Sequence, residues 1–255
     1  MRVESMQLTI TPAHRLVWSR DVFGNSIAIV DFLEASDSLQ IVSDVTILRT
    51  SPFPTETPHE PWSVAFPVNY NPLEVELISA YQVAIFPDEI GELSEWVKSV
   101  LPASGSTDAE EIVFTLGRAI RDRIKYQRRS EKGVRSPLET LRLATGSCRD
   151  MATLLMESCR TLGFATRFAS GYLDCAASMV GHASTHAWTE VYLPALGWRG
   201  FDPTIGEPAG LKHVVTGVSN HPRGVMPVSG KFTGTASDCK LMVVNVKTET
   251  LPPSI

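Results

Sequence analysis

The chain has 255 residues, of which 43% are hydrophobic and 20% are charged, and its 23 basic and 28 acidic side chains give a net charge of −5. This is the composition of an average globular protein, so it excludes a disordered chain, and the charge gives no reason to expect nucleic-acid binding. Because the sequence has neither an apolar run of about 18 residues nor a signal-peptide pattern, we expect a cytoplasmic protein that does not associate with a membrane.

The beginning of the chain is rich in predicted β-strands. Segments 7–11, 26–32 and 39–48 are β-branched or alternate between apolar and polar residues. A turn sequence at 23–25 and a polar break at 35–38 separate these segments, so we predict strands that are connected by hairpins.

A proline-rich stretch then interrupts the regular elements. Five prolines lie within residues 51–67, which predicts a connecting loop. We therefore place a boundary near residue 70. The expected domains are a β-rich N-terminal region at 1–70 and a larger core at 71–255.

Four helices are predicted next, because apolar residues recur at helical spacing. The first covers residues 88–101, and the second begins with the capping-box spacing of Thr107 and Glu110. The third begins at residues 136–137, with a proline at the first helical position, and we expect Gly146 to end it.

The fourth helix carries the first chemically informative residue. It opens at Cys148 and ends at Gly163. Unpaired N–H groups and the positive end of the helix dipole favour a thiolate at the first turn. The same N–H groups are directed at the space in which the oxygen of a tetrahedral intermediate would lie. Cys148 is therefore a candidate nucleophile, whereas Cys159 is expected to lie in the core.

The last part of the chain returns to strand-like patterns. Strands are predicted at 164–173, 185–193 and 198–202, with the last two joined as an antiparallel hairpin by a turn at the intervening proline and glycine. Residues 206–230 are rich in loop signals, and residues 241–246 are predicted to form a final strand.

The predicted hairpin brings together two candidate partners for the cysteine. If it is symmetric about Pro194, His186 lies directly opposite Asp202, and directly opposed side chains project from the same face of a sheet. A thiol that attacks an amide needs an imidazole, and the imidazole needs a third group to fix its tautomer. We therefore predict a His186–Asp202 hydrogen bond that is presented to Cys148.

His182 offers an alternative interpretation of the same stretch. Together with His186 it has H-x3-H spacing, which beside further ligands is typical of a zinc site. No second ligand pair with metal spacing follows, so we expect neither a metal nor another cofactor. We expect His182 to lie in a loop near the cleft.

Several motifs surround these residues in a fixed order: Gly146-Ser147-Cys148-Arg149-Asp150, the segment 162–167, His186-Ala187-Trp188-Thr189-Glu190 and Phe201-Asp202-Pro203-Thr204. Over residues 105–205 the chain resembles the transglutaminase-like cysteine peptidase superfamily. Residues 21–25 are similar to a turn in the β-rich N-terminal region of its bacterial branch.

The resemblance implies an α+β fold with a papain-like core, in which a helix that carries the cysteine packs on an antiparallel sheet. It implies that Cys148 is the nucleophile, His186 the general base and acid, and Asp202 the orienting carboxylate. It also implies acyl transfer through a thioester with a peptide or protein amide as the substrate, as in a cysteine protease or amidase. Tyr172, Trp188 and His182 are expected substrate contacts.

Two other functions fit the same pattern. A thioester can also pass its acyl group to an amine, so protein cross-linking at glutamine is an alternative to hydrolysis. A non-catalytic binding module could use the same fold, although it would not need all three residue types. The sequence indicates neither the substrate's identity nor the oligomeric state.

Overall fold

The computed structural model divides the chain into two compact units, Met1–Pro61 and Trp62–Ile255. The described residues are 1–49, 64–102, 107–129, 131–174, 185–194, 196–235, 238 and 242–251. The first unit contains strands in its described part, and the second combines helices with sheets. The expected α+β class with a β-rich beginning is therefore confirmed.

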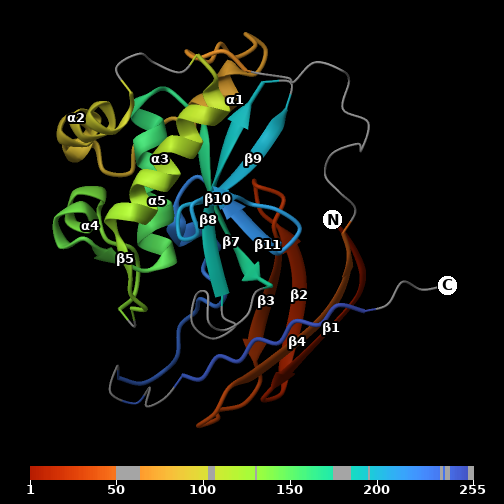
Figure 1. Cartoon of the computed structure of the whole chain (residues 1–255). Coiled ribbons are helices and arrows are strands. Elements are labelled where there is room, and N and C mark those ends of the chain that lie inside the picture. Colours follow the sequence, from red (N-terminus) through yellow and green to blue (C-terminus); the bar gives the residue numbers. More distant parts are fainter. Residues whose placement is uncertain are drawn as a thin grey trace. The chain divides into compact units, whose positions relative to one another are not determined.

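The first unit consists of two antiparallel strand pairs (Figure 1). Strand β1, Arg2–Thr11, pairs with β4, Gln40–Leu48, and β2, His14–Arg20, pairs with β3, Ser26–Phe32. Strands β2 and β3 form a hairpin around the predicted turn, although the segment of β2 was not among the predicted strands. The pairing of β1 with β4 joins distant segments, and local alternation does not specify such a partner.

The turn between β2 and β3 is organised by Asp21. Its carboxylate accepts hydrogen bonds from the backbone N–H groups of Phe23 and Asn25, each at 2.9 Å. Gly24 adopts a φ of 82°, which a side chain would make unfavourable. The turn predicted at 23–25 is confirmed.

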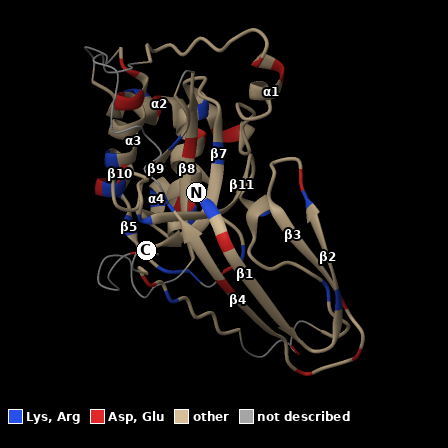
Figure 2. Cartoon of the chain, turned by 90° about the vertical axis from the view of Figure 1, so that its right-hand side faces the viewer, with Lys and Arg blue, Asp and Glu red and all other residues tan. Residues whose placement is uncertain are grey.

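The strands of the first unit carry few charged residues, as Figure 2 shows. These are Arg2, Glu4, Arg15, Arg20, Asp31 and Asp44. Among the described residues of this unit only Ile10 is buried, while apolar side chains such as Val17 and Ile29 are exposed. The residues of the first unit that the structure describes, 1–49, therefore form no packed core of their own.

The helices of the second unit are α1 Val75–Ser79, α2 Ile90–Val100, α3 Ala109–Arg123, α4 Pro137–Leu143 and α5 Cys148–Thr161, with 3-10 turns at Pro87–Glu89 and Pro222–Val225. No helix within the described ranges is both long and apolar enough to cross a membrane. The four predicted helices correspond to α2 to α5.

Two predicted helix ends require correction. Asp108, not Thr107, caps α3, and its side chain accepts a hydrogen bond from the N–H of Glu111 at 3.0 Å. These two residues have the same spacing as the predicted pair. Helix α4 ends at Ala144 in the left-handed region with a φ of 51°, before Gly146 is reached.

The main sheet of the second unit has the antiparallel order β10-β9-β8-β7-β11. Its strands are β7 Thr166–Leu173, β8 Thr185–Leu193, β9 Gly197–Asp202, β10 Glu207–Pro208 and β11 His213–Ser219, and a separate parallel pair is formed by β5 Lys125–Tyr126 and β6 Thr145–Gly146. Strands β7, β8 and β9 confirm the three predicted segments. The loop prediction for 206–230 is wrong where β11 forms, and residues 242–246 form no strand.

Helix α5 lies at the centre of the second unit, and Figure 1 shows the larger helices gathered on one side of the sheet. Cys159, Leu154 and Leu155 of α5 are fully buried in the same apolar core as Leu116 of α3. The hydroxyl of Thr189 on β8 donates a 2.7 Å hydrogen bond to the carbonyl of Ala152 on α5. This contact fixes the first turns of the helix against the strand that also carries His186.

Candidate active site

Cys148 is the first residue of α5 and is 8% exposed. The helix begins here because Asp150, three residues beyond the cap Ser147, reaches back to it. The Asp150 carboxylate accepts hydrogen bonds from the Ser147 N–H at 2.9 Å and from its hydroxyl at 2.8 Å. The sequence therefore places the thiol at a helix N-terminus, as expected.

Asp150 is held from outside the helix as well. Arg129 donates to it through Nε at 2.8 Å and through Nη2 at 3.2 Å, and the backbone N–H of Arg135 donates at 2.8 Å. Burial by itself would raise the pKa of Asp150, but the hydrogen bonds from Arg135 and Ser147 and the charge of Arg129 hold it below its usual value. The ionised side chain thus joins the start of α5 to the segment before α4.

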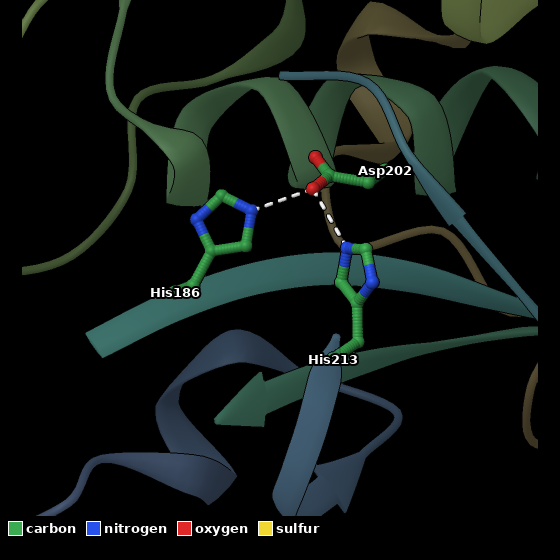
Figure 3. A group of neighbouring side chains, drawn as sticks. All are labelled: His186, Asp202 and His213. Carbon is green, nitrogen blue, oxygen red and sulfur yellow. Dashed lines mark hydrogen bonds and ion pairs between the residues drawn. The ribbon is translucent and has the colours of Figure 1, made fainter. Parts of the chain in front are cut away.

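His186 and Asp202 meet at one end of the sheet, where β8 begins and β9 ends (Figure 3). We call this end, with His186, Asp202 and the first residue of β11, the sheet corner. The Nε2 atom of His186 lies 2.7 Å from Oδ2 of Asp202, and the other carboxylate oxygen accepts the N–H of Thr204 at 2.8 Å. His186 is 4% exposed and Asp202 is fully buried. The hydrogen bond predicted between them is present.

The pairing that brings them together differs from the predicted one. Strand β8 pairs with β9 so that Thr189 lies opposite Phe201, and continuing that register places Asp202 opposite Trp188 rather than His186. The predicted register is wrong by two positions. Because side chains alternate with a period of two, an even error leaves His186 and Asp202 on the same face as diagonal neighbours.

His213, which sequence reasoning missed, is a second histidine on the same carboxylate. It is the first residue of β11, and its Nε2 atom lies 3.0 Å from Oδ2 of Asp202 (Figure 3). The β-branched residues at 214–216 are the signal that could have predicted a strand here. The glycines and prolines of the surrounding segment concealed it.

Hydrogen bonds and charges dominate the electrostatics of this corner. Burial would raise the pKa of Asp202, but the hydrogen bonds from His186 and His213 and the charge of His186 hold it well below its usual range. Burial would lower the pKa of His186, but hydrogen bonds to Asp202 and to Cys148, with the charges of both, raise it to about 10. His186 is therefore protonated at neutral pH.

Cys148 at the helix end contributes to the raised pKa of His186, so the thiol and the imidazole are neighbours. Because Nε2 of His186 is directed at Asp202, Nδ1 is the ring nitrogen left for the sulfur. His186 thus has Asp202 on one side and Cys148 on the other.

The expected substrate contacts lie at different depths. Trp188 is 2% exposed, and its ring centroid lies 6.3 Å from that of His186 and 5.2 Å from that of His213. Tyr172 is half-buried on β7, where it pairs with β8 and β11. Their roles as substrate contacts stay predictions, and His182 lies outside the described residues.

Within the described part of the chain, His186, Asp202 and His213 form a group that could hold a metal ion, because their ligand atoms lie within 4.8 Å of one another. All three ligand atoms already take part in the hydrogen bonds described above. The sequence pattern that pointed to zinc, by contrast, involved His182.

Two family models match parts of the chain. Residues 98–203 match the model of the transglutaminase-like superfamily, and residues 1–48 match that of the bacterial transglutaminase-like N-terminal region. The chain therefore contains a transglutaminase-like core and a bacterial transglutaminase-like N-terminal region. The matched core contains the start of α5 together with β8 and β9, and it ends just after Asp202.

The chain is also similar to individual proteins. An uncharacterized protein of Mycobacterium leprae is 29% identical over 113 residues, which are 42% of this chain and 40% of that protein. A candidate cysteine protease from Cytophaga hutchinsonii matches in structure with a TM-score of 0.66 and 16% identity, over 87% of this chain and 72% of the other. The structural match establishes a transglutaminase-like, papain-like fold.

Proposed function

We propose that this transglutaminase-like protein is a cysteine peptidase or amidase that cleaves peptide or protein amides through a thioester on Cys148. One observation carries the proposal: His186 is hydrogen-bonded to Asp202, and Cys148, the first residue of a helix, is near enough to His186 to contribute to its raised pKa. A nucleophile, a proton carrier and an orienting carboxylate are the parts that acyl transfer requires.

Acylation uses the charge distribution of the resting site. The Cys148 thiolate attacks the amide carbonyl carbon, and backbone N–H groups of the first turn of α5 stabilise the oxyanion. The protonated His186 then gives its Nδ1 proton to the departing amine as the C–N bond breaks. Cys148 is left as a thioester and His186 as a neutral imidazole.

Deacylation reverses these roles. Neutral His186 takes a proton from a water molecule, whose oxygen attacks the thioester carbon. The C–S bond breaks, the carboxylic acid is released, and the thiolate and the imidazolium are restored. Asp202 keeps the imidazole oriented throughout, because its hydrogen bond fixes Nε2 as a protonated nitrogen.

The test has two independent arms. In the first, iodoacetamide labels the native protein near neutral pH, and Cys159 serves as an internal reference because burial raises the pKa of that thiol. In the second, a library of peptides and amides is incubated with the native protein and with Cys148→Ala, and products are read by mass spectrometry.

We expect Cys148 to react faster than a free thiol, and the Cys148→Ala variant to lose hydrolysis. Alkylation no faster than that of a free thiol, together with full hydrolysis by Cys148→Ala, would contradict the proposal. A fluorescent amine is included in a parallel reaction. Its incorporation into a glutamine-containing protein without release of cleaved peptide would identify an amine transferase instead.

A further inference from the structure

His213 occupies a place beside Asp202 that the proposed reaction does not yet use. Oδ2 of Asp202 is hydrogen-bonded to Nε2 of both His186 and His213, and Oδ1 accepts a hydrogen bond from the N–H of Thr204. The carboxylate is fully buried. A buried charge is stable only where donors replace water, so each of these donors bears on whether Asp202 stays ionised.

The hydrogen bonds on the His213 ring define its protonation. The backbone N–H of Gly210 donates to Nδ1 of His213 at 3.1 Å. A ring nitrogen that accepts a hydrogen bond carries no proton, so the proton of the neutral ring lies on Nε2. With Nδ1 as the acceptor, His213 is placed to donate to Asp202 through Nε2–H.

The surroundings also fix the position of the ring. Trp188 lies edge-on to His213, with a centroid separation of 5.2 Å. Strand β11 approaches β7 so closely at Gly171 that a Cβ there would lie 2.0 Å from the carbonyl oxygen of Val214. The first residue of β11 is thus held beside the corner by a contact that requires glycine on the neighbouring strand.

The same hydrogen bonds argue against a metal in this group. To coordinate a cation, Nε2 of His213 must lose its proton, and the neutral ring then carries a proton on Nδ1, which faces the N–H of Gly210. Nε2 of His186 would also have to leave Asp202. The hydrogen bonds of His186 and His213 are therefore suited to hold the Asp202 carboxylate in place rather than to coordinate a metal ion.

We propose that His213 is a positioning residue, which holds the Asp202 carboxylate through an Nε2–H hydrogen bond and so keeps His186 directed at Cys148. The inference rests on the proposed function for its catalytic consequence. Among the residues that the structure describes, the titratable groups that face Asp202 are His186 from β8 and His213 from β11, and Cys148 from α5 faces His186.

The test compares two substitutions at one position. His213→Gln keeps an N–H donor at a similar reach, whereas His213→Leu removes it. His221→Leu is the matched control, because Nδ1 of His221 also accepts a backbone N–H, that of Arg223 at 3.0 Å, on a residue outside the Asp202 cluster. The rate of Cys148 alkylation by iodoacetamide is measured against pH for all variants, with circular dichroism to monitor folding.

In His213→Leu we expect turnover to fall about 10- to 100-fold, mostly in kcat. Without its donor the buried carboxylate takes up a proton at higher pH, and the charge that keeps His186 protonated is then lost. The acid limb of the alkylation profile is the pH range in which the rate of Cys148 alkylation falls as the pH is lowered. The midpoint of this limb should therefore move up by about one to two pH units. His213→Gln and His221→Leu should keep the native profile.

A second measurement needs no substitution. With 15N-labelled histidine, the ring nitrogen shifts of native His213 should report the neutral Nε2–H tautomer at pH 7. An Nδ1–H tautomer or an imidazolium there would overturn the proposal, as would equal acid limbs in the Leu and Gln variants. Neither readout depends on turnover, so both stay distinct from the Cys148→Ala test of the function itself.

Discussion

The start of α5 and the corner of the sheet supply the two halves of the candidate site in different ways. At the helix, Cys148 is placed by Ser147 and Asp150, which are its close neighbours in the sequence, and by Arg129 shortly before it. At the sheet, three separate strands each contribute a single side chain. The first half depends on local capping, and the second depends on strand register.

The largest expected effect tests the sheet corner. Asp202→Asn keeps the size of the side chain but removes the charge that holds His186 protonated and oriented. We expect kcat/KM to fall by about 10³- to 10⁴-fold, on the scale of lost orienting carboxylates in catalytic triads. The measurement uses a substrate from the library screen, with urea unfolding to verify the fold. Activity within tenfold of native would contradict the role given to this carboxylate.

A substitution at the start of α5 should lower the stability of the protein. Asp150→Asn removes the nearer carboxylate of Arg129, whose side chain is 9% exposed, and leaves Glu131 at 3.7 Å. We expect the free energy of unfolding to fall by about 3–5 kcal/mol, because a buried cation loses its close counter-charge. Glu95→Gln, at an exposed pair with Lys98, is the control and should cost at most about 1 kcal/mol. Similar losses in both variants would mean that the Asp150 network does not anchor α5.

The pH dependence of stability should separate the corner from the rest of the molecule. The pKa of His186 is raised from 6.5 to about 10 in the folded state, so the stabilisation that it contributes is complete below its unfolded value. It is then lost as the pH rises toward 10. We expect the native free energy of unfolding to fall over this range more steeply than that of His186→Gln, in urea titrations. Parallel curves for the two proteins would contradict the raised pKa.

The smallest effects concern two helix ends next to the site. Ala144 ends α4 with a φ of 51°, and Gly163 follows α5 with a φ of 85°. Ala144→Gly should stabilise the protein by about 0.5–1 kcal/mol, and Gly163→Ala should destabilise it by about 1 kcal/mol or more, because only glycine adopts this region without strain. Thermal unfolding measures both changes, and shifts in the same direction would refute this account.

Much of the helix half was predictable from the sequence. The cap that precedes Cys148, the apolar spacing and the stop at Gly163 act between neighbours, and α5 begins at the predicted residue. The same reasoning erred by one residue at the cap of α3, where Asp108 and Glu111 repeat the spacing of the predicted pair. Such errors are small because capping hydrogen bonds span only a few residues.

The sheet half was predictable only in part. His186 and Asp202 were expected on one face, and they are, although the register differs by two positions. The even error preserved the conclusion, whereas an odd one would have placed the two side chains on opposite faces. His213 was not predicted at all, because its strand lies in a segment whose glycines and prolines indicate a loop.

The sequence by itself determined the identities and order of the reactive groups, the helix that presents Cys148, and the strands that carry His186 and Asp202. Tertiary structure alone decided which atoms surround the Asp202 carboxylate, since β11 joins β7 across a long separation in the chain. The physical reason is the range of the interactions. Helix caps are satisfied by adjacent residues, whereas the partners of a strand depend on how the whole sheet buries its surface.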